Sequence, residues 1–255
     1  MTTMTQKTTE AGTGLLRSLK HLQGYNVHAT DQEVGTVHDT RFDDESWVIQ
    51  YFVIDTGNWL PGRKVLISPA AVGHPEWSDG VVPVQLTGKA IEDAPTADLD
   101  QPISADYRQT LGVHHGWPVL WSGTMPGLTL DPGAPPPKID VERLERSHLR
   151  STREVTGYRI EATDGEIGHV EDFIAEEGSW AVRYMVVDTK NWLPGRKVLV
   201  APSWVREIDW AGKRVHVDLE RERIQNSPPF DPSTPVNREY EVRLYDYYGR
   251  PHYWA

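Results

Sequence analysis

The stretch NWLPGRKVL occupies residues 58–66 and recurs without change at residues 191–199. The two copies lie 133 positions apart, and the same offset relates the residues around them. From Gly24 to Pro69, 25 of 46 positions match the second copy without a gap. A repeat of this length means that one structural unit occurs twice in the chain. We therefore expect two similar domains.

The repeat extends beyond that block and sets the expected domain boundaries. Leu16-Arg17-Ser18 recurs as Leu149-Arg150-Ser151, and Trp121 corresponds to Trp254. We expect a flexible N-terminal tail (1–14), a first repeat with a C-terminal arm (15–121), a proline-rich linker (122–148) and a second repeat with its arm (149–255). The run of prolines at 135–137 favours an extended linker. A short helix over 143–150 would lead into the second repeat.

Composition excludes several classes of protein. With 38% hydrophobic and 25% charged residues, the chain resembles ordinary globular proteins. No apolar run approaches the ~18 residues of a membrane span, and the polar opening lacks a secretory signal, so we expect no membrane insertion and a cytoplasmic location. The absence of cysteine excludes disulfides and thiolate chemistry. A net charge of −11 makes nucleic acid an unfavourable partner.

Each repeat is predicted to be mainly β. In the first repeat, strands are expected at 24–29, 34–42, 47–55, 64–68 and 82–86. Both faces of the segment 47–55 are apolar, so this strand should be covered on both sides. Gly35 and Gly168 are expected where two backbones approach closely or at a bulge, and Asp164-Gly165 predicts a hairpin turn. Many short strands with regular turns favour a small closed barrel or a sandwich over a parallel sheet.

Short helices are expected after the strands of each repeat. One pair covers residues 89–93 and 221–225, and a second pair covers 105–111 and 238–245. These helices begin the C-terminal arms, which we expect to lie over the strands.

The order of motifs in each copy resembles the PRC-barrel domain. In the second copy the motifs are Gly157-Tyr158, Thr163-Asp164-Gly165-Glu166-Ile167-Gly168, Val170-Glu171-Asp172-Phe173, the strand that begins at Trp180, Val187-Asp188-Thr189, and Lys197-Val198-Leu199-Val200-Ala201-Pro202. The resemblance covers about 75 residues of each copy. It implies two PRC-type small β-barrels in tandem, related by a pseudo-two-fold axis and completed by short helices and C-terminal arms.

The resemblance also implies a range of functions. The chain is similar to the cytoplasmic domain of the photosynthetic reaction-centre H subunit, to the C-terminal domain of the ribosome maturation factor, and above all to stand-alone bacterial PRC-barrel proteins. It departs from the first because it shows no membrane helix, and from the second because a second PRC-like copy replaces the separate preceding barrel. What the resemblance implies is therefore the fold and a tendency to bind proteins, since fold alone does not define function.

The repeated turn is the candidate interaction surface. Aromatic residues and arginine are enriched where proteins bind one another, and the turn offers both in each copy. The candidate residues are Trp59, Leu60, Arg63, Trp192, Leu193 and Arg196. The alternative interpretation is that these side chains pack against the sheet and anchor the turn.

No motif for catalysis, a cofactor or a metal ion is present. The sequence contains no HExxH, GxSxG, GxxxxGK[ST] or GxGxxG pattern. The doublet His114-His115 corresponds to Tyr247-Tyr248 in the second copy, which favours a structural role over zinc binding. We therefore expect no enzymatic activity, no cofactor and no metal site.

The predicted function is a non-enzymatic scaffold or adaptor with two similar modules and an unidentified protein partner. Envelope or stress physiology is one setting for such a role, and a homodimer is one further option. Three alternatives stay open: a ribosome- or RNA-associated factor, a small-molecule binder or enzyme with a cleft between the barrels, and a reaction-centre H-like assembly subunit.

Overall fold

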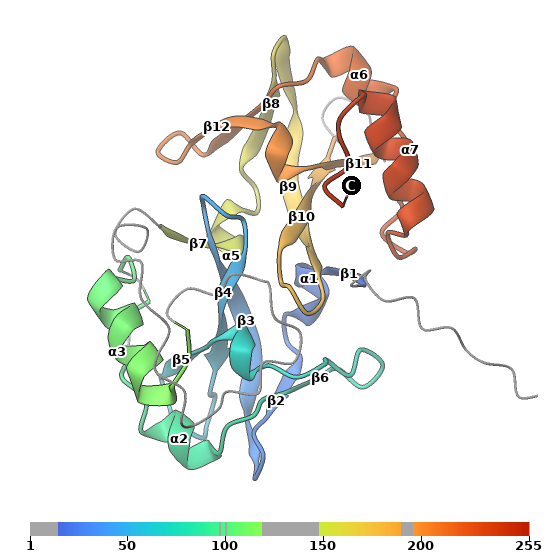
Figure 1. The fold of residues 1–255 in the computed structure, drawn as a ribbon. Coiled ribbons are helices and arrows are strands. Elements are labelled where there is room, and N and C mark those ends of the chain that lie inside the picture. The colour runs from blue at the N-terminus through green and yellow to red at the C-terminus, as the bar shows by residue number, and fades with distance from the viewer. Residues whose placement is uncertain (1–14, 97, 100, 119–147, 190–195, 255) are drawn as a thin grey trace, which may run out of the picture.

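The computed structural model describes residues 15–96, 98–99, 101–118, 148–189 and 196–254. Its main elements are two β-sheets, one centred on each repeat, with short helices around them (Figure 1). The first repeat forms the lower half of Figure 1 and the second repeat the upper half. The mainly β class predicted from the sequence is confirmed.

The sheet of the first repeat has six strands. Five follow the order β5-β4-β3-β2-β6, and β7 pairs with β3 beside them. The strands are β2 (Asn26–His28), β3 (Glu33–Asp43), β4 (Ile49–Asp55), β5 (Lys64–Ile67), β6 (Val81–Pro83) and β7 (Leu149–Ser151).

The sheet of the second repeat follows the same plan. Its order is β11-β10-β9-β8-β13-β12, and β1 pairs with β9. The strands are β1 (Leu16–Ser18), β8 (Arg159–Ala162), β9 (Gly165–Glu176), β10 (Val182–Asp188), β11 (Lys197–Val200), β12 (Val205–Asp209) and β13 (Arg214–Val217).

Both sheets are mixed. Strands β2 and β6 run parallel, as do β8 and β13, whereas the other named pairs are antiparallel. Among the described residues, the strand pairings do not close either sheet into a barrel. Closure into two small barrels therefore remains a prediction.

The strand β4 is buried on both faces, as its sequence predicts. Ile49, Tyr51, Phe52, Val53 and Ile54 are each at most 3% exposed. One face packs into its own repeat and the other is covered across the repeat contact, where Phe52 meets Trp180 edge to face with ring centroids 4.8 Å apart. At about 25 cal/mol per Å² of apolar surface, burying these side chains supplies much of the driving force for this sheet.

Of the two options predicted for Gly35 and Gly168, the close approach of backbones is confirmed. A Cβ atom on Gly35 would lie 2.0 Å from the carbonyl oxygen of Asp55, and one on Gly168 would lie 2.0 Å from that of Asp188. Both glycines also have positive φ, +137° and +148°, which residues with a side chain rarely adopt. At both equivalent positions, the close approach of the two backbones therefore requires glycine.

Among the described residues the helices are α1 (Leu19–Leu22), α2 (Gly88–Glu92), α3 (Ala105–His115), α5 (Thr152–Val155), α6 (Arg221–Gln225) and α7 (Arg238–Tyr248), with 3₁₀ turns η1 (Pro69–Ala71) and η2 (Pro202–Trp204). Helices α2, α3, α6 and α7 fall close to their predicted positions, whereas α1 and α5 were not predicted. Helices α3 and α7 continue past their predicted ends and stop at Gly116 and Gly249, each left-handed. The helix expected over 143–150 is wrong at its end, because Leu149 and Arg150 belong to β7, and residues 143–147 lie outside the described part.

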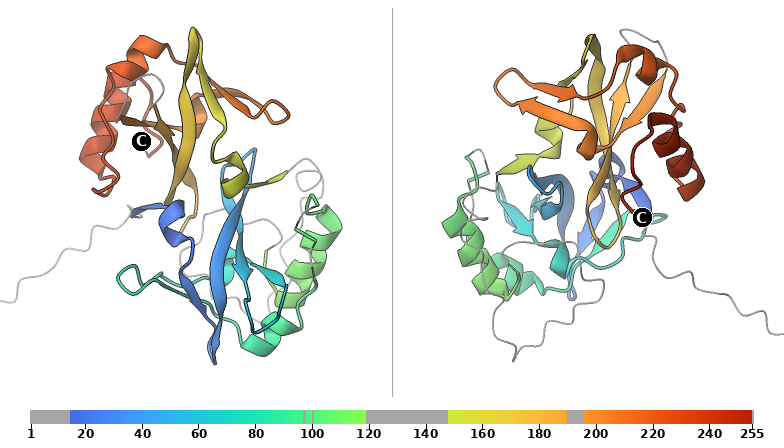
Figure 2. Two further views of the ribbon diagram at one scale, coloured as in Figure 1. Left: turned by 180° about the vertical axis from the view of Figure 1, so that it is seen from behind. Right: turned by 45° about the horizontal axis from the view of Figure 1, so that its top comes forward.

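The N-terminal arms of the two repeats are exchanged. Strand β1 precedes the first repeat but pairs with β9 of the second, and β7 precedes the second repeat but pairs with β3 of the first. The registers are equivalent, since Leu16 lies opposite Glu176 as Leu149 lies opposite Asp43. Figures 1 and 2 show α1 and β1, in blue, beside the strands of the second repeat. Each sheet therefore contains strands from both halves of the chain.

A second reciprocal contact lies between the two hairpins. Val48 and Ala181, which occupy equivalent positions, form an antiparallel bridge with each other. Around them the Ile49 amide donates to the carbonyl of Trp180 (2.9 Å), and the Val182 amide donates to the carbonyl of Trp47 (2.7 Å). Such pairing of equivalent residues is what a pseudo-two-fold axis through this bridge requires. The buried apolar residues of both repeats join in one continuous core.

Candidate functional site

The repeated turn follows β4 in the first repeat, and its backbone is held from within. The Thr56 hydroxyl donates to the carbonyls of Leu60 (2.8 Å) and Arg63 (2.7 Å), and the Trp59 amide donates to the Thr56 carbonyl (3.0 Å). Trp59 and Leu60 are half-buried, and Trp59 packs against the core. Trp59 therefore combines an anchoring contact with an accessible portion.

The two arginines of the repeated turn perform the same internal task. Both guanidinium groups donate to backbone carbonyls at or just after the end of a short helix. Arg63 donates to the carbonyls of Glu92, the last residue of α2, and of Ala94 beyond it, and Arg196 donates to that of Ser227 after α6. Ala94 and Ser227 are equivalent positions, so each arginine braces its turn against the same part of its repeat. This shared role explains why arginine recurs. Trp192 and Leu193 lie outside the described residues.

The structure also brings together residues that the sequence analysis did not single out. In each exchanged arm a serine hydroxyl donates to an aspartate on the other repeat. The Ser18–Asp172 and Ser151–Asp39 distances are both 2.6 Å. The same serines accept from the backbone amides of His21 and Glu154 and so cap α1 and α5. In each arm, one serine thus caps a helix and also binds the arm to the other repeat.

The aspartates of this contact are multiply hydrogen-bonded. Asp172 also accepts from the backbone amides of Lys20 (3.0 Å) and Phe173 (2.7 Å). Burial raises the pKa of Asp172 above its ordinary value, against these hydrogen bonds, which favour the charged form. The carboxyl group thus links its own strand to the arm of the other repeat.

Arginines on the arms reinforce the exchange with aromatic partners. Arg17 pairs with Glu177 (3.4 Å) and lies over the ring of Trp77, 4.6 Å from the ring centroid. In the other arm Arg150 pairs with Asp44 (3.1 Å) and lies 3.9 Å from the ring centroid of Trp210. Trp77 and Trp210, which occupy equivalent positions, thus each form a cation–π contact with an arginine of an arm.

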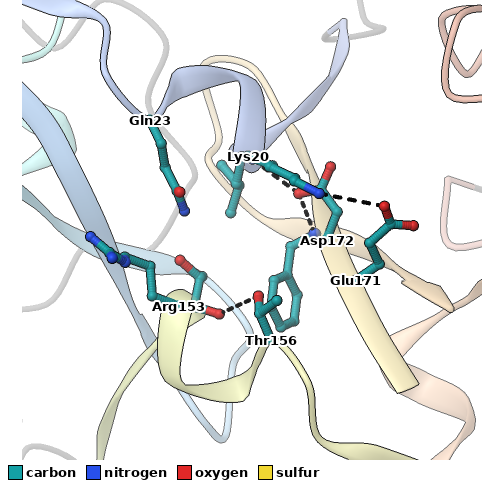
Figure 3. Close-up of a pocket in the computed structure, with 9 residues that line it drawn as sticks. Lys20, Gln23, Arg153, Thr156, Glu171 and Asp172 are labelled. Carbon is teal, nitrogen blue, oxygen red and sulfur yellow. Dashed lines mark hydrogen bonds and ion pairs between the residues drawn. The ribbon is translucent and has the colours of Figure 1, made fainter. Parts of the chain in front are cut away.

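A small cavity opens between the two arm helices (Figure 3). It has a volume of about 150 Å³. Lys20 belongs to α1 and Gln23 follows it, and at the equivalent positions Arg153 belongs to α5 and Thr156 follows it. Glu171 of β9 forms a further wall and binds the ammonium groups of Lys197 (2.7 Å) and Lys20 (3.4 Å).

The two carboxylates of this cavity, Glu171 and Asp172, have hydrogen-bond partners within the fold. Burial works against ionisation of Glu171, but hydrogen bonds from Lys197 and Lys20 outweigh it and hold the pKa of this carboxyl below its usual value. The Thr156 hydroxyl donates to the Thr152 carbonyl (2.9 Å), so no base activates it as a nucleophile. Sites for organic ligands usually measure about 300–1,000 Å³. At half the lower bound, this particular cavity is too small for such a ligand.

Other candidate chemistry is also limited within the described residues. They contain no group of three or more histidine, aspartate or glutamate side chains placed to hold a metal ion. His115 instead stacks on Trp117, with ring centroids 4.1 Å apart, and burial lowers its pKa to about 4. No helix in the described ranges has the length and apolar character to cross a bilayer.

Comparisons with known proteins leave the family open. No family model matches the chain. An uncharacterised protein of Deinococcus radiodurans is 32% identical over 78 residues, which amount to 31% of this chain and 28% of that protein. The match thus spans less than a third of the relative's length, and the PRC-barrel resemblance continues as a proposal.

Proposed function

We propose that the protein is a non-enzymatic interaction scaffold that presents two similar modules to protein partners. The reciprocal exchange of the arms carries this proposal, because it ties the two similar repeats to each other. In the proposal each sheet belongs to a PRC-type small barrel, an assignment that rests on the sequence resemblance. The proposed location is the cytoplasm.

The turn of the first repeat supports the choice of surface. Its arginine is used to brace the turn, so Trp59 and Leu60 are the side chains left to contact a partner. A half-buried tryptophan on a braced turn loses little conformational entropy on binding, which is typical of interface hot spots. A partner with two matching sites would gain about 100-fold or more in affinity from binding both modules at once.

A capture experiment from native lysate tests the proposal. The wild-type chain is compared with Trp59→Ala, Trp192→Ala, the double variant, and Val113→Ala, which removes an exposed apolar side chain outside the turns. Circular dichroism first confirms that each variant folds. We expect specific proteins on the wild type and on Val113→Ala, weaker capture by each single variant, and loss from the double variant.

Two outcomes contradict the proposal at different levels. If the double variant captures the same proteins as the wild type, the turns are not the binding surface. If the wild type captures no protein reproducibly, the scaffold role itself is wrong.

A further inference from the structure

We propose that a second surface, the inter-repeat groove, binds a lysine or arginine side chain of a protein partner. We define this groove by Asp44, Glu45, Trp47, Arg206, Glu207 and Trp210. The inference rests on the proposed scaffold role and adds to it the chemistry of the partner and a site distinct from the repeated turns.

The groove has the size and walls that such a ligand requires. Its volume is about 400 Å³, within the usual range for bound ligands and well above the 150 Å³ of the cavity between the arm helices. One wall is the turn between β3 and β4, and the other is β12 of the second repeat. Trp47 and Trp210, both half-buried, supply an indole from each wall.

The charge of the groove selects a cation. Asp44 is already paired with Arg150 (3.1 Å). Glu45 and Glu207 are exposed, and neither forms an ion pair with any other described residue. Arg206 is the one arginine or lysine among the lining residues, so carboxylates predominate, as they do in the whole chain with its net charge of −11. A basic side chain placed here would gain two charge-assisted contacts.

The protein already holds one of its own arginines in this manner at the edge of the groove. The guanidinium group of Arg150 lies over Trp210, 3.9 Å from the ring centroid, while its Nε binds Asp44. A carboxylate beside an indole is thus a combination that accommodates a guanidinium group in this part of the fold. The unpaired Glu45 and Glu207 offer the same combination to a group from outside.

The pseudo-two-fold axis supplies an internal comparison. At the positions equivalent to Glu45 and Glu207 the other side of the molecule has Gly178 and His74, so both unpaired carboxylates are missing. The indole equivalent to Trp47, that of Trp180, is only 3% exposed. His74 contacts Glu177 (3.2 Å), which also accepts from the Trp77 indole (3.0 Å). The proposed site is therefore present once, on one side.

The test is a titration of the full chain followed by NMR of the indole N–H signals. The probe is the blocked peptide Gly-Gly-Arg-Gly-Gly, and its citrulline analogue, which lacks the charge, is the matched ligand control. Trp47 and Trp210 signals are assigned by Trp47→Phe and Trp210→Phe variants. We expect these two signals to shift with the arginine peptide and to remain in place with the citrulline peptide.

Charge variants distinguish binding of the peptide in the groove from non-specific electrostatic attraction to an acidic protein. Glu45→Gln/Glu207→Gln should weaken binding of the arginine peptide about tenfold, the equivalent of about 1.4 kcal/mol. The control Glu222→Gln/Glu239→Gln changes two exposed glutamates on α6 and α7 by the same charge and should bind as the wild type does. Equal weakening by both double variants, or shifts confined to other indoles, would overturn the inference.

The capture experiment distinguishes failure of the groove from failure of the scaffold. If the peptide does not bind while the wild type still captures partners through its turns, the groove is wrong and the scaffold stands. If the peptide binds but no protein is captured, the groove binds cations and the scaffold role is wrong.

Discussion

The two repeats hold their exchanged arms alike but pack their C-terminal helices differently. Ser18–Asp172 and Ser151–Asp39 are equivalent contacts of equal length. In the C-terminal helices, by contrast, the buried position of α7 occupied by Glu241 corresponds to Arg108 in α3, so the buried charge has opposite sign. Each arm binds the other repeat, so the same serine–aspartate contact must form on both repeats. Each C-terminal helix packs on its own sheet and can differ from its counterpart.

The second repeat surrounds its buried charge with aromatic residues. Glu241 accepts from the hydroxyl groups of Tyr184 and Tyr253 (both 2.8 Å) and pairs with Arg238 (2.9 Å). Trp204 contacts the same helix, with its ring 4.7 Å from that of Tyr248. In the first repeat, the residues equivalent to Trp204 and Tyr248 are Ala71 and His115. The first repeat therefore has smaller side chains at these two positions.

The largest expected effect comes from breaking this network. Glu241→Ala should lower the free energy of unfolding by about 3–5 kcal/mol, because it leaves Arg238 and two tyrosine hydroxyls without their buried partner. Urea denaturation measures the loss, and Glu239→Ala, an exposed glutamate of the same helix, should stay within about 0.5 kcal/mol of the wild type. A loss below 1 kcal/mol for Glu241→Ala would mean that the network contributes little to stability.

A smaller effect tests whether the two arms are held equally. Asp39 accepts from the hydroxyl groups of Ser151 and Thr152 and from the amides of Thr40 and Arg153, whereas the position equivalent to Thr152 is Leu19, which has no hydroxyl. Asp172→Ala should lower the free energy of unfolding by about 2–3 kcal/mol. Asp39→Ala should lower it by roughly 1 kcal/mol more, because Asp39 accepts one additional hydrogen bond.

Double-mutant cycles check the assignment of that cost to the arms. Ser18→Ala should couple to Asp172→Ala, and Ser151→Ala to Asp39→Ala, by about 0.5–3 kcal/mol, while the crossed pairs should be additive. Additivity within the contacting pairs would show that the arms do not depend on these carboxylates.

The smallest expected effect concerns acid sensitivity of the first repeat. The folded protein lowers the pKa of His115 from 6.5 to about 4, chiefly through burial. Between these two values the unfolded chain binds the additional proton, so His115 makes stability fall as the pH falls from 6.5 towards 4. His115→Tyr introduces the residue of the second repeat and should reduce that part of the fall. Urea denaturation at pH 7 and pH 4.5 measures it, and an unchanged pH dependence would locate the acid-sensitive group elsewhere.

Much of the local structure was predictable because it depends on short patterns. The doubly apolar strand at 47–55, the Asp164-Gly165 hairpin and the close approach at Gly35 and Gly168 each follow from residues near one another in sequence. The candidate turn was also recognisable, but the use of Arg63 as a brace was not. Its acceptors lie about thirty residues away, and no periodicity connects them.

Sequence alone was enough to predict a mainly β duplication and the helices α2, α3, α6 and α7, because repeats, alternation and turn residues reflect local geometry. It did not determine which sheet each arm joins. Asp39 and Asp172 offer equivalent carboxylates, so Leu16-Arg17-Ser18 could in principle bind either one. The exchange depends on the tertiary structure, which brings residues 106 to 160 positions apart into contact and places two indoles and two unpaired carboxylates in one groove.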